Sequence, residues 1–385
     1  MSSYPTSRCR RRKMKTSLTI LISLLFSISA VSSWSDAPPG HYNAITDVVG
    51  IEVGHYAEKP FLTGTTVILA KQGAVGAVDV RGSAPGTRET DLLNPINLVE
   101  KVHAIVLSGG SAYGLATADG VMECLEEQGI GFPVGGGHVV PIVPAAILYD
   151  LGRCATDFKK RPDAKYGLKA CKAVARGPVA QGNVGAGTGA RSGGLKGGIG
   201  TASIDLGNGV IVGAIVAVNS FGSTVNPQTG KLYGAFLEIG NEFGNLQAPK
   251  SSLNKSQHMI AWNETDLVRN TTIAIVATNV ELTKAQALKI AQMAHDGMAR
   301  AIRPAHAMFD GDTIFTLATG QIRLQTLPDQ ATWGNIPASI TRIGSAAADT
   351  VSRAIVHAML AAKTIPDCLT SYCDKYPGAC PNRKD

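Results

Sequence analysis

The fold of this chain is constrained most by a series of short apolar runs, each bounded by glycine or another turn-forming residue. Runs of this length and composition are typical of buried strands. The predicted strands cover residues 65–70, 76–81, 104–107, 200–206, 210–219, 271–278 and the later IFTLAT segment, and residues 44–54 read as two short strands around a turn. Strands buried on both faces need helices or a second sheet to cover them.

Helical patterns separate these strands. They cover residues 91–102, 115–128, 164–175, 282–300 and 343–362, and Thr283 is suited to cap the fourth of them. Glycine makes up 43 of the 385 residues, well above the usual share of about 7%, which indicates many tight turns. Because 44% of the residues are hydrophobic and 17% charged, the chain can bury a large core. The sequence therefore predicts an α/β fold with mixed sheets.

The first 32 residues have the three-part layout of a secretory signal peptide. A basic stretch is followed by an apolar run over residues 18–28 and by small residues up to Ser32. The run is short for a membrane span of about 20 residues, so an uncleaved anchor is the less favoured alternative. We expect a secreted or periplasmic protein with no stable membrane span once residues 1–32 are removed.

The positive charge is concentrated in that leader. Residues 1–35 hold six of the Lys and Arg residues and no acid, so the net charge of +7 falls to 7 − 6 = +1 without them. A nearly neutral chain without a basic stripe does not fit nucleic-acid binding. We therefore expect no nucleic-acid partner.

Six cysteines remain after Cys9 leaves with the leader, and an even number in an exported chain permits disulfides. Three of them, Cys368, Cys373 and Cys380, lie in the last part of the chain. No histidine lies nearby and the spacing does not suit a zinc site. We predict a disulfide-stapled tail over residues 365–385, without fixing the pairing, and no metal site.

Two glycine-rich segments suggest known motifs but do not complete them. Residues 182–200 contain GAGTGA, yet the strand before and the helix after that a dinucleotide fingerprint needs are missing. We expect this backbone to wrap around a site and to present Lys196 at its end. The segment SGGSAYG around Ser111 does not satisfy G-x-S-x-G, which favours a plain strand-to-helix turn.

The Asn270-Thr271-Thr272 segment opens a predicted strand after a long polar connection. A threonine hydroxyl is a poor nucleophile unless a base lies beside it, and a freed α-amino group of the same threonine can be that base. Its pKa of about 7.7–8.0 leaves part of it neutral at physiological pH. The residues alone favour the simpler interpretation, in which the segment is a turn before a strand or a glycosylation sequon.

Three further polar residues are candidates for the same chemistry. Asp310 and Asp312 flank Gly311, and in a strand both would face one side, where paired acids can orient an ammonium group or carry a proton. A solvated or calcium-like turn is the alternative. Asn219 ends a buried strand, where it is either an oxyanion donor or a turn former.

Taken together, motifs over about residues 40–362 resemble the DmpA-type peptidase family. That family contains β-peptidyl aminopeptidases, L-aminopeptidase/D-esterase-amidases and nylon-oligomer hydrolases. The motifs occur in order and include ITDVVGIEVGH, VLSGGSAYGL, VPIVPAAILYDLG, GNVGAGTGA, LKGGIGTAS, NTTIAIVAT and MFDGDTIFTLATG. The resemblance implies a four-layer αββα fold of the N-terminal-nucleophile type, shared in outline with ornithine acetyltransferases.

The resemblance also implies self-processing between Asn270 and Thr271. The products would be an α chain of residues 33–270 and a β chain that begins at residue 271 and ends its peptidase part at residue 364. Thr271 would be the nucleophile, and Asn219 would match the residue of the oxyanion hole. Asp310 and Asp312 would match the acidic or Ser/Glu pair that holds the Thr271 ammonium, and Lys196 would match a lysine that lines the site. Tyr149 would match a substrate-facing tyrosine, although the residues around it differ from the pattern of the aminopeptidase branch.

The function implied is that of an exported, self-cleaving aminopeptidase or amidohydrolase that releases N-terminal residues from small peptides, amides or esters. Two alternatives stay open, which are an endo-type oligoamide hydrolase and a catalytically silent exported binding protein of the same fold. The resemblance implies no cofactor, and it implies a homo-oligomer of αβ heterodimers. The sequence does not choose between α-amino, β-amino and D-amino substrates.

Overall fold

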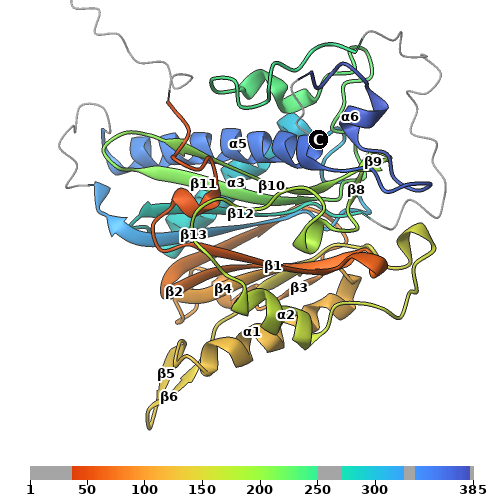
Figure 1. The fold of residues 1–385 in the computed structure, drawn as a ribbon. Helices are drawn as coiled ribbons and strands as arrows, with labels where there is room; N and C mark the ends of the chain where they lie inside the picture. The colour runs from red at the N-terminus through yellow and green to blue at the C-terminus, as the bar shows by residue number, and fades with distance from the viewer. Residues whose placement is uncertain (1–36, 250–269, 325–333, 382–385) are drawn as a thin grey trace, which may run out of the picture. The chain divides into compact units, whose positions relative to one another are not determined.

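The computed structural model describes residues 37–249, 270–324 and 334–381, which form an α/β fold in four layers (Figure 1). Eight strands lie side by side in the order β10-β11-β12-β13-β2-β4-β7-β3, and β1 pairs with β2 beside this path. Their bounds are β1 Glu52–Glu58, β2 Thr63–Val80, β3 Thr87–Arg88, β4 Lys101–Ser108, β7 Ala145–Ile147, β10 Gly198–Asp205, β11 Ile211–Val218, β12 Ile273–Val280 and β13 Thr313–Ile322.

The long strand β2 belongs to two sheet layers. Its first half pairs with β1 and β4, and its second half, from residue 75 to Val80, pairs with β13. The ladder with β4 is irregular between Leu69 and Ala74, where the strand passes from one layer to the other. One layer therefore contains β10 to β13, and the other contains β1, β4, β7 and β3.

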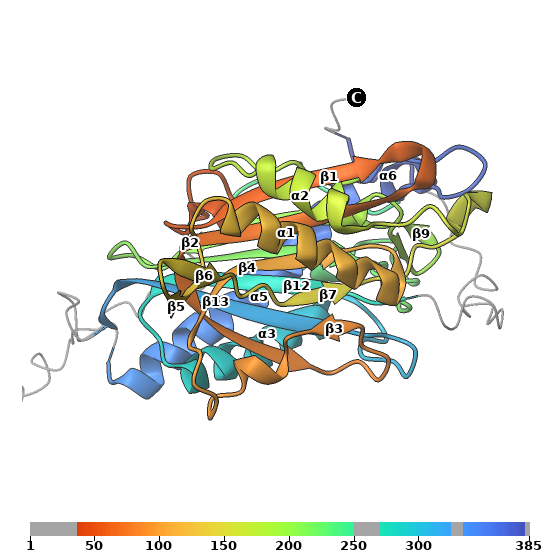
Figure 2. The same ribbon diagram turned by 90° about the horizontal axis from the view of Figure 1, so that it is seen from below.

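Side chains alternate between the layers as the period of a strand requires. Ile68 and Ile105 pack against Ile275 and Phe315 in the core between the two sheet layers. Their strand neighbours point outward. Val67 and Val106 pack under α1, Thr117–Glu126, and α2, Ala164–Lys172, on one side (Figure 2).

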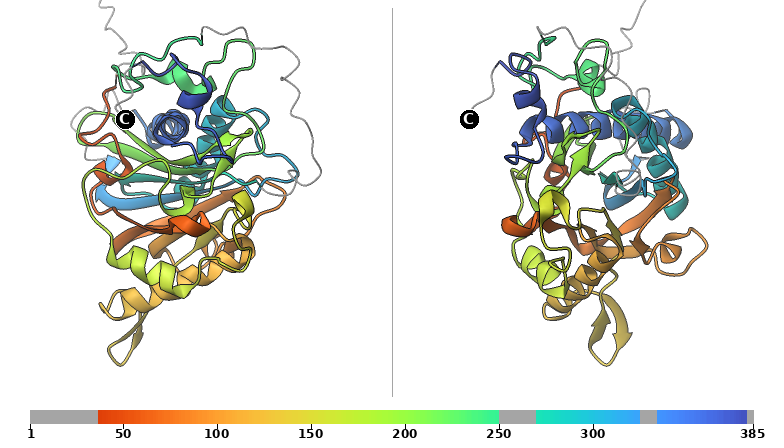
Figure 3. Two further views of the ribbon diagram at one scale, coloured as in Figure 1. Left: turned by 45° about the vertical axis from the view of Figure 1, so that its right-hand side comes forward. Right: turned by 90° about the vertical axis from the view of Figure 1, so that its right-hand side faces the viewer.

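The other outer face of the sheets is covered by two longer helices. These are α3, Lys284–Ala301, and α5, Ile336–Ala361, which pack on the outward side chains of β10 to β13. The left view of Figure 3 shows α5 nearly end-on, with the sheets beneath it and α1 and α2 beneath the sheets. Thr283 caps α3 by accepting the Gln286 amide, as the sequence predicts.

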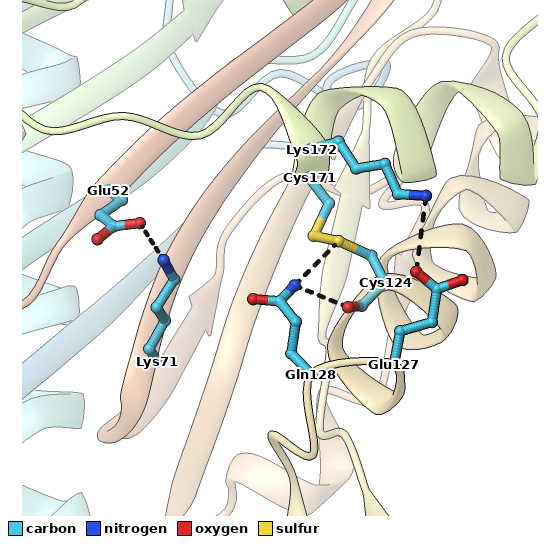
Figure 4. Close-up of a disulfide and its surroundings, with 7 residues drawn as sticks. All are labelled: Glu52, Lys71, Cys124, Glu127, Gln128, Cys171 and Lys172. Atoms are coloured by element: carbon cyan, nitrogen blue, oxygen red, sulfur yellow. Dashed lines mark hydrogen bonds and ion pairs between the residues drawn. A yellow bond between two sulfur atoms is a disulfide. The ribbon is translucent and has the colours of Figure 1, made fainter.

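The helices α1 and α2 are joined by a disulfide. Cys124 and Cys171 form it, and the side chain of Gln128 donates to the Cys124 carbonyl at 2.8 Å beside it (Figure 4). Both cysteines are buried. The disulfide therefore lies within the outer layer next to β4, where it fixes the two helices to each other.

Several predicted elements differ in the structure. Residues 44–54 contain a short 3-10 turn, Ile45–Asp47, where the first of two strands is predicted, and the second is the start of β1. Residues 65–70 and 76–80 are parts of the one strand β2, which continues through Gly73 despite the positive φ of 72° there. Residues 91–102 form a short 3-10 turn, Asp91–Leu93, and then the start of β4 instead of a helix. Residues 132–140, where no element is predicted, contain the hairpin of β5, Phe132–Gly135, and β6, His138–Val140.

The C-terminal tail contains two more disulfides, one within the tail and one that joins it to the rest of the domain. Cys373 pairs with Cys380 around the short helix α6, Tyr372–Lys375, and Cys368 pairs with the distant Cys154. The predicted signal peptide, residues 1–32, lies outside the described residues. Within the described ranges no helix has the length and apolar character that a membrane crossing needs.

Candidate active site

The predicted nucleophile lies where three neighbouring strands of one layer meet. Thr271 comes two residues before β12, whose Ile273 pairs with Ala217 of antiparallel β11 and with Thr313 of parallel β13. The end of β11 and the start of β13 are therefore next to the start of β12. This register brings Asn219, Thr271 and the Asp310–Asp312 turn to one edge of the layer, although they are far apart in the sequence.

The contacts of Thr271 join these segments directly. Its amide donates to the Asn219 carbonyl at 2.7 Å, and its Oγ1 accepts the Gly311 amide at 3.1 Å. The same hydroxyl donates to the carbonyl oxygen of Asn270. Asn270 and Thr271 are both buried. The hydroxyl thus lies against the peptide bond that the sequence predicts to be cut.

Asp310 and Asp312 are buried in the turn before β13, which excludes the solvated turn considered above. Asp312 Oδ1 accepts the Thr272 amide at 2.8 Å, and its Oδ2 lies 2.9 Å from Nδ1 of His306. Asp310 accepts the amides of Phe221 and Ala307, each at 3.2 Å. Burial, together with the Asp312 charge, raises the pKa of Asp310 to about 7.

Asn219 is fully buried, and its amide has a defined orientation. Oδ1 accepts from Nη1 of Arg153 at 2.7 Å and from the Arg191 amide at 2.9 Å. Nδ2 donates to the Tyr149 carbonyl at 3.4 Å. The Tyr149 backbone therefore contacts the predicted oxyanion donor, and no substrate-facing role of its side chain follows from these contacts.

Lys196 ends the glycine-rich segment and is fully buried. The segment wraps around its ammonium group, which donates to the carbonyls of Gly187 and Gly197, each at 2.8 Å. Burial and the nearby charge of Arg153 lower the pKa of Lys196 to about 7, against an opposite effect of Asp150. An amine with this pKa is partly neutral at physiological pH and can accept a proton.

Sequence reasoning did not select Arg153 or Asp150. Arg153 donates from Nη2 to the Tyr149 carbonyl at 2.8 Å and from Nη1 to the Gly189 carbonyl at 2.9 Å. Asp150 is buried and accepts the Gly110 amide at 2.7 Å, and burial raises its pKa to about 6. Both residues lie in an irregular loop, so no periodic pattern marks them. A buried charge inside the apolar segment AAILYDLG is the only signal for Asp150.

The described part of the chain holds no group of three or more His, Cys, Asp or Glu side chains arranged for a metal ion. The absence of a cofactor stays a prediction.

A model of peptidase family S58 matches residues 43–369. The chain belongs to peptidase family S58. This confirms the resemblance seen in the motifs, and it makes the chain a hydrolase. A relative from Mycobacterium leprae described as an uncharacterized aminopeptidase is 44% identical over 364 residues, which are 88% of this chain and 95% of the relative. A 6-aminohexanoate-oligomer endohydrolase of Kocuria sp. is 31% identical over 322 residues, which are 81% of this chain and 84% of the relative.

Solved structures of similar proteins confirm the fold of this S58 member. A Burkholderia sp. beta-aminopeptidase has a TM-score of 0.62 at 25% identity, over 88% of this chain and 92% of that one. An L-aminopeptidase D-Ala-esterase/amidase from Ochrobactrum anthropi, described as a variant of the Ntn hydrolase fold, has a TM-score of 0.61 at 23% identity, over 88% and 94%. The α/β fold of the N-terminal-nucleophile type predicted from the sequence is thus confirmed.

Proposed function

We propose that this S58 peptidase is an exported aminopeptidase or amidohydrolase that cuts itself between Asn270 and Thr271 and then uses Thr271 as its N-terminal nucleophile. One observation carries the proposal. The Thr271 hydroxyl contacts the carbonyl of Asn270 inside a buried site, where the Thr271 amide donates to the Asn219 carbonyl and the hydroxyl accepts the Gly311 amide of the Asp310–Asp312 turn.

Self-cleavage begins when Thr271 Oγ1 attacks the carbonyl carbon of Asn270. The hydroxyl proton passes to the Thr271 nitrogen as the C–N bond breaks, which gives an ester and a free α-amino group. Water then hydrolyses the ester and releases the Asn270 carboxylate. The Gly311 amide, 3.1 Å from Oγ1, holds the hydroxyl in place for this step.

Turnover repeats the same chemistry on a substrate. The freed amine takes the proton of the Thr271 hydroxyl as Oγ1 attacks a substrate amide or ester, and Asn219 Nδ2 donates to the oxyanion. The leaving group departs with a proton, and water hydrolyses the acyl-enzyme. Asp310 and Asp312 hold the Thr271 ammonium, and Lys196 lines the site.

The decisive test is the mass and N-terminal sequence of the purified protein. We expect two fragments, one of which begins Thr271-Thr272-Ile273, and hydrolysis of aminoacyl p-nitroanilides. Thr271→Ala should leave the chain intact and inactive. Thr272→Val is the matched control, because Thr272 is buried and its hydroxyl has no hydrogen-bond partner in the structure. An intact but active wild type would exclude the proposal, and an inactive, intact chain would favour the silent binding protein.

An endo-type oligoamide hydrolase is the second candidate, and the identity of 31% with the Kocuria endohydrolase favours it. Product analysis separates the two. Residues released one at a time from the N-terminus of a peptide indicate the aminopeptidase. Internal fragments from a linear oligomer of 6-aminohexanoate, with a blocked N-terminus, indicate the endohydrolase.

Export is supported by the leader over residues 1–32 and by three disulfides, since disulfides form and persist in oxidising compartments. We expect the protein recovered from culture medium or periplasm to begin near residue 33. Size-exclusion chromatography with light scattering tests whether the αβ heterodimers form an oligomer. We expect a mass of several αβ pairs, and the mass of a single αβ pair would contradict the proposal.

A further inference from the structure

The guanidinium group of Arg153 lies in the middle of three acceptors at the proposed site. Nη1 donates to Asn219 Oδ1 at 2.7 Å and to the Gly189 carbonyl at 2.9 Å, and Nη2 donates to the Tyr149 carbonyl at 2.8 Å. A planar guanidinium fixes the direction of several hydrogen bonds at once. Arg153 therefore ties the side chain of Asn219 to two backbone segments.

These contacts determine which way the Asn219 amide points. The atom that faces both Nη1 of Arg153 and the Arg191 amide must be the oxygen, because both neighbours are N–H donors. The NH₂ group is then the other branch of the side-chain amide, which donates to the Tyr149 carbonyl. An oxyanion hole needs that NH₂ group as a donor that is already oriented before the reaction.

We infer that Arg153 is a positioning residue that holds the Asn219 amide in its donor orientation, and that the disulfide Cys154–Cys368 of the C-terminal tail holds Arg153 in place. The inference rests on the proposed role of Asn219 in catalysis. It gives the tail, residues 365–381 of the described chain, a part in the reaction without any contact to the substrate.

The backbone around Arg153 shows why such support is needed. Gly152, Cys154 and Ala155 all have positive φ angles, of 62°, 57° and 58°. Residues with a side chain rarely adopt this left-handed region, and they persist in it where the surroundings fix them. The disulfide to Cys368 fixes one of these residues directly. The tail has a second link to the proposed site, because the Lys196 amide donates to the Thr370 carbonyl of the tail at 2.9 Å.

This disulfide is also open to reagents in solution. Cys368 is exposed and Cys154 half-buried, and both line a surface hollow of about 570 Å³ together with Lys59, Pro60 and Leu62. The disulfide Cys124–Cys171 is buried by comparison. Dithiothreitol, which supplies two electrons and two protons and becomes a cyclic disulfide, should therefore reduce Cys154–Cys368 to two thiols before it reduces Cys124–Cys171.

The first test is a double-mutant cycle with Arg153→Ala and Asn219→Ala, read as kcat and KM separately and as the rate of self-cleavage. Loss of an oxyanion donor costs about 10²–10³ in kcat, so we expect Arg153→Ala to lower kcat by about tenfold or more and to leave KM within about twofold. Arg153→Ala should add nothing to Asn219→Ala, because it acts through that residue.

Additive effects in this cycle, or an Arg153→Ala enzyme with unchanged kcat, would overturn the inference while the wild type stays cleaved and active. A wild type that is neither cleaved nor active would overturn the proposed function first. Where Arg153→Ala does not fold, Arg153→Lys replaces it. The ammonium group keeps the charge but cannot bind all three acceptors in one plane, so the same fall in kcat is expected.

The second test removes the disulfide. Cys154→Ala/Cys368→Ala should lower kcat in the same direction as Arg153→Ala, and dithiothreitol should lower the kcat of the wild type but not that of the double variant. Cys373→Ala/Cys380→Ala is the matched control, because it removes the other disulfide of the tail. A double variant with the kcat of the wild type would contradict the role of the tail.

Discussion

The two carboxyl groups of the Asp310–Asp312 turn have different surroundings. Asp312 accepts the Thr272 amide and both the amide and Nδ1 of His306, which stabilises a negative charge on it. Asp310 has two longer contacts from backbone amides, at 3.2 Å. Burial and the charge of Asp312 raise the pKa of Asp310 to about 7, so the pair holds a proton on Asp310 at neutral pH and below.

This arrangement predicts a pH dependence with a definite sign. Below its pKa Asp310 is neutral and cannot pair with the Thr271 ammonium, so kcat should fall as the pH drops through that pKa, which the positive charge of the ammonium lowers from the value of about 7 in the uncut chain. Asp312→Asn removes the neighbouring charge and lowers the pKa of Asp310. The acid limb of the pH–kcat profile should then move to lower pH by about 1 unit.

The exposed Asp296 on α3 provides the control. Asp296→Asn should leave the profile of the wild type unchanged. An acid limb that stays in place in Asp312→Asn, or that moves to higher pH, would show that Asp310 does not set this limb.

At the scale of single residues, the motifs predicted those parts of the site that lie at strand ends. Asn219, Thr271 and the two aspartates are such residues, and the structure brings them together. Arg153 was not predicted, because its position depends on an irregular loop with positive φ angles and on a disulfide to a residue far along the chain. The contact of Gly311 with Oγ1 was not predicted either, because it uses a backbone amide, which no residue type marks.

At the scale of elements, α1 and α2 approach each other through a pair of glycines. A Cβ on Gly120 would lie 1.7 Å from the Ala164 carbonyl oxygen, and a Cβ on Gly167 would lie 1.8 Å from that of Thr117. Cys124 and Cys171 come one helical turn after these glycines, on the same faces, and form the disulfide of Figure 4. Close backbone contact and the covalent bond thus act at the same crossing.

Gly167→Ala should therefore destabilise the protein. The atom that the new methyl group meets is a backbone carbonyl oxygen, so the helices must separate against the disulfide. We expect a loss of about 1–3 kcal/mol in the free energy of unfolding, as for other overpacked sites, measured by urea unfolding under non-reducing conditions. Lys165→Ala, at an exposed position of the same helix, should change it by less than about 0.5 kcal/mol. Equal effects of the two variants would contradict the role of the crossing.

The sequence predicted the helices and most strands because their apolar residues repeat with the period of the element. It failed for residues 91–102, where the pattern suited a helix. There the Lys284 ammonium of α3 donates to the carbonyls of Leu92, Asn97 and Val99, each at 3.0 Å. A distant side chain thus satisfies a non-helical backbone, and such tertiary contacts cannot be read from local periodicity.

At the scale of the whole domain, the proposed cut lies at the start of a central strand. β12 pairs with β11, which precedes the cut, and with β13, which follows it. Both fragments also contribute to the core between the sheet layers and to the core under α3 and α5. Because neither fragment can bury its apolar surface alone, we expect them to stay together after cleavage.

The three disulfides allow a sharp test of the cut and of the pairing together. Cys124–Cys171 lies within the fragment before Thr271, and Cys373–Cys380 lies within the fragment after it. Cys154–Cys368 alone among these three joins the two fragments. Denaturing electrophoresis of the cleaved protein should therefore give one band without reductant and two bands with it.

Two variants assign this result to the bond between the fragments. Cys368→Ala should give two bands under both conditions, because nothing covalent then joins the fragments, whereas Cys373→Ala/Cys380→Ala should behave like the wild type. A wild type that gives one band even with reductant has not been cut. A wild type that gives two bands without reductant lacks the bond between Cys154 and Cys368, and the tail would then have no covalent hold on the Arg153 loop.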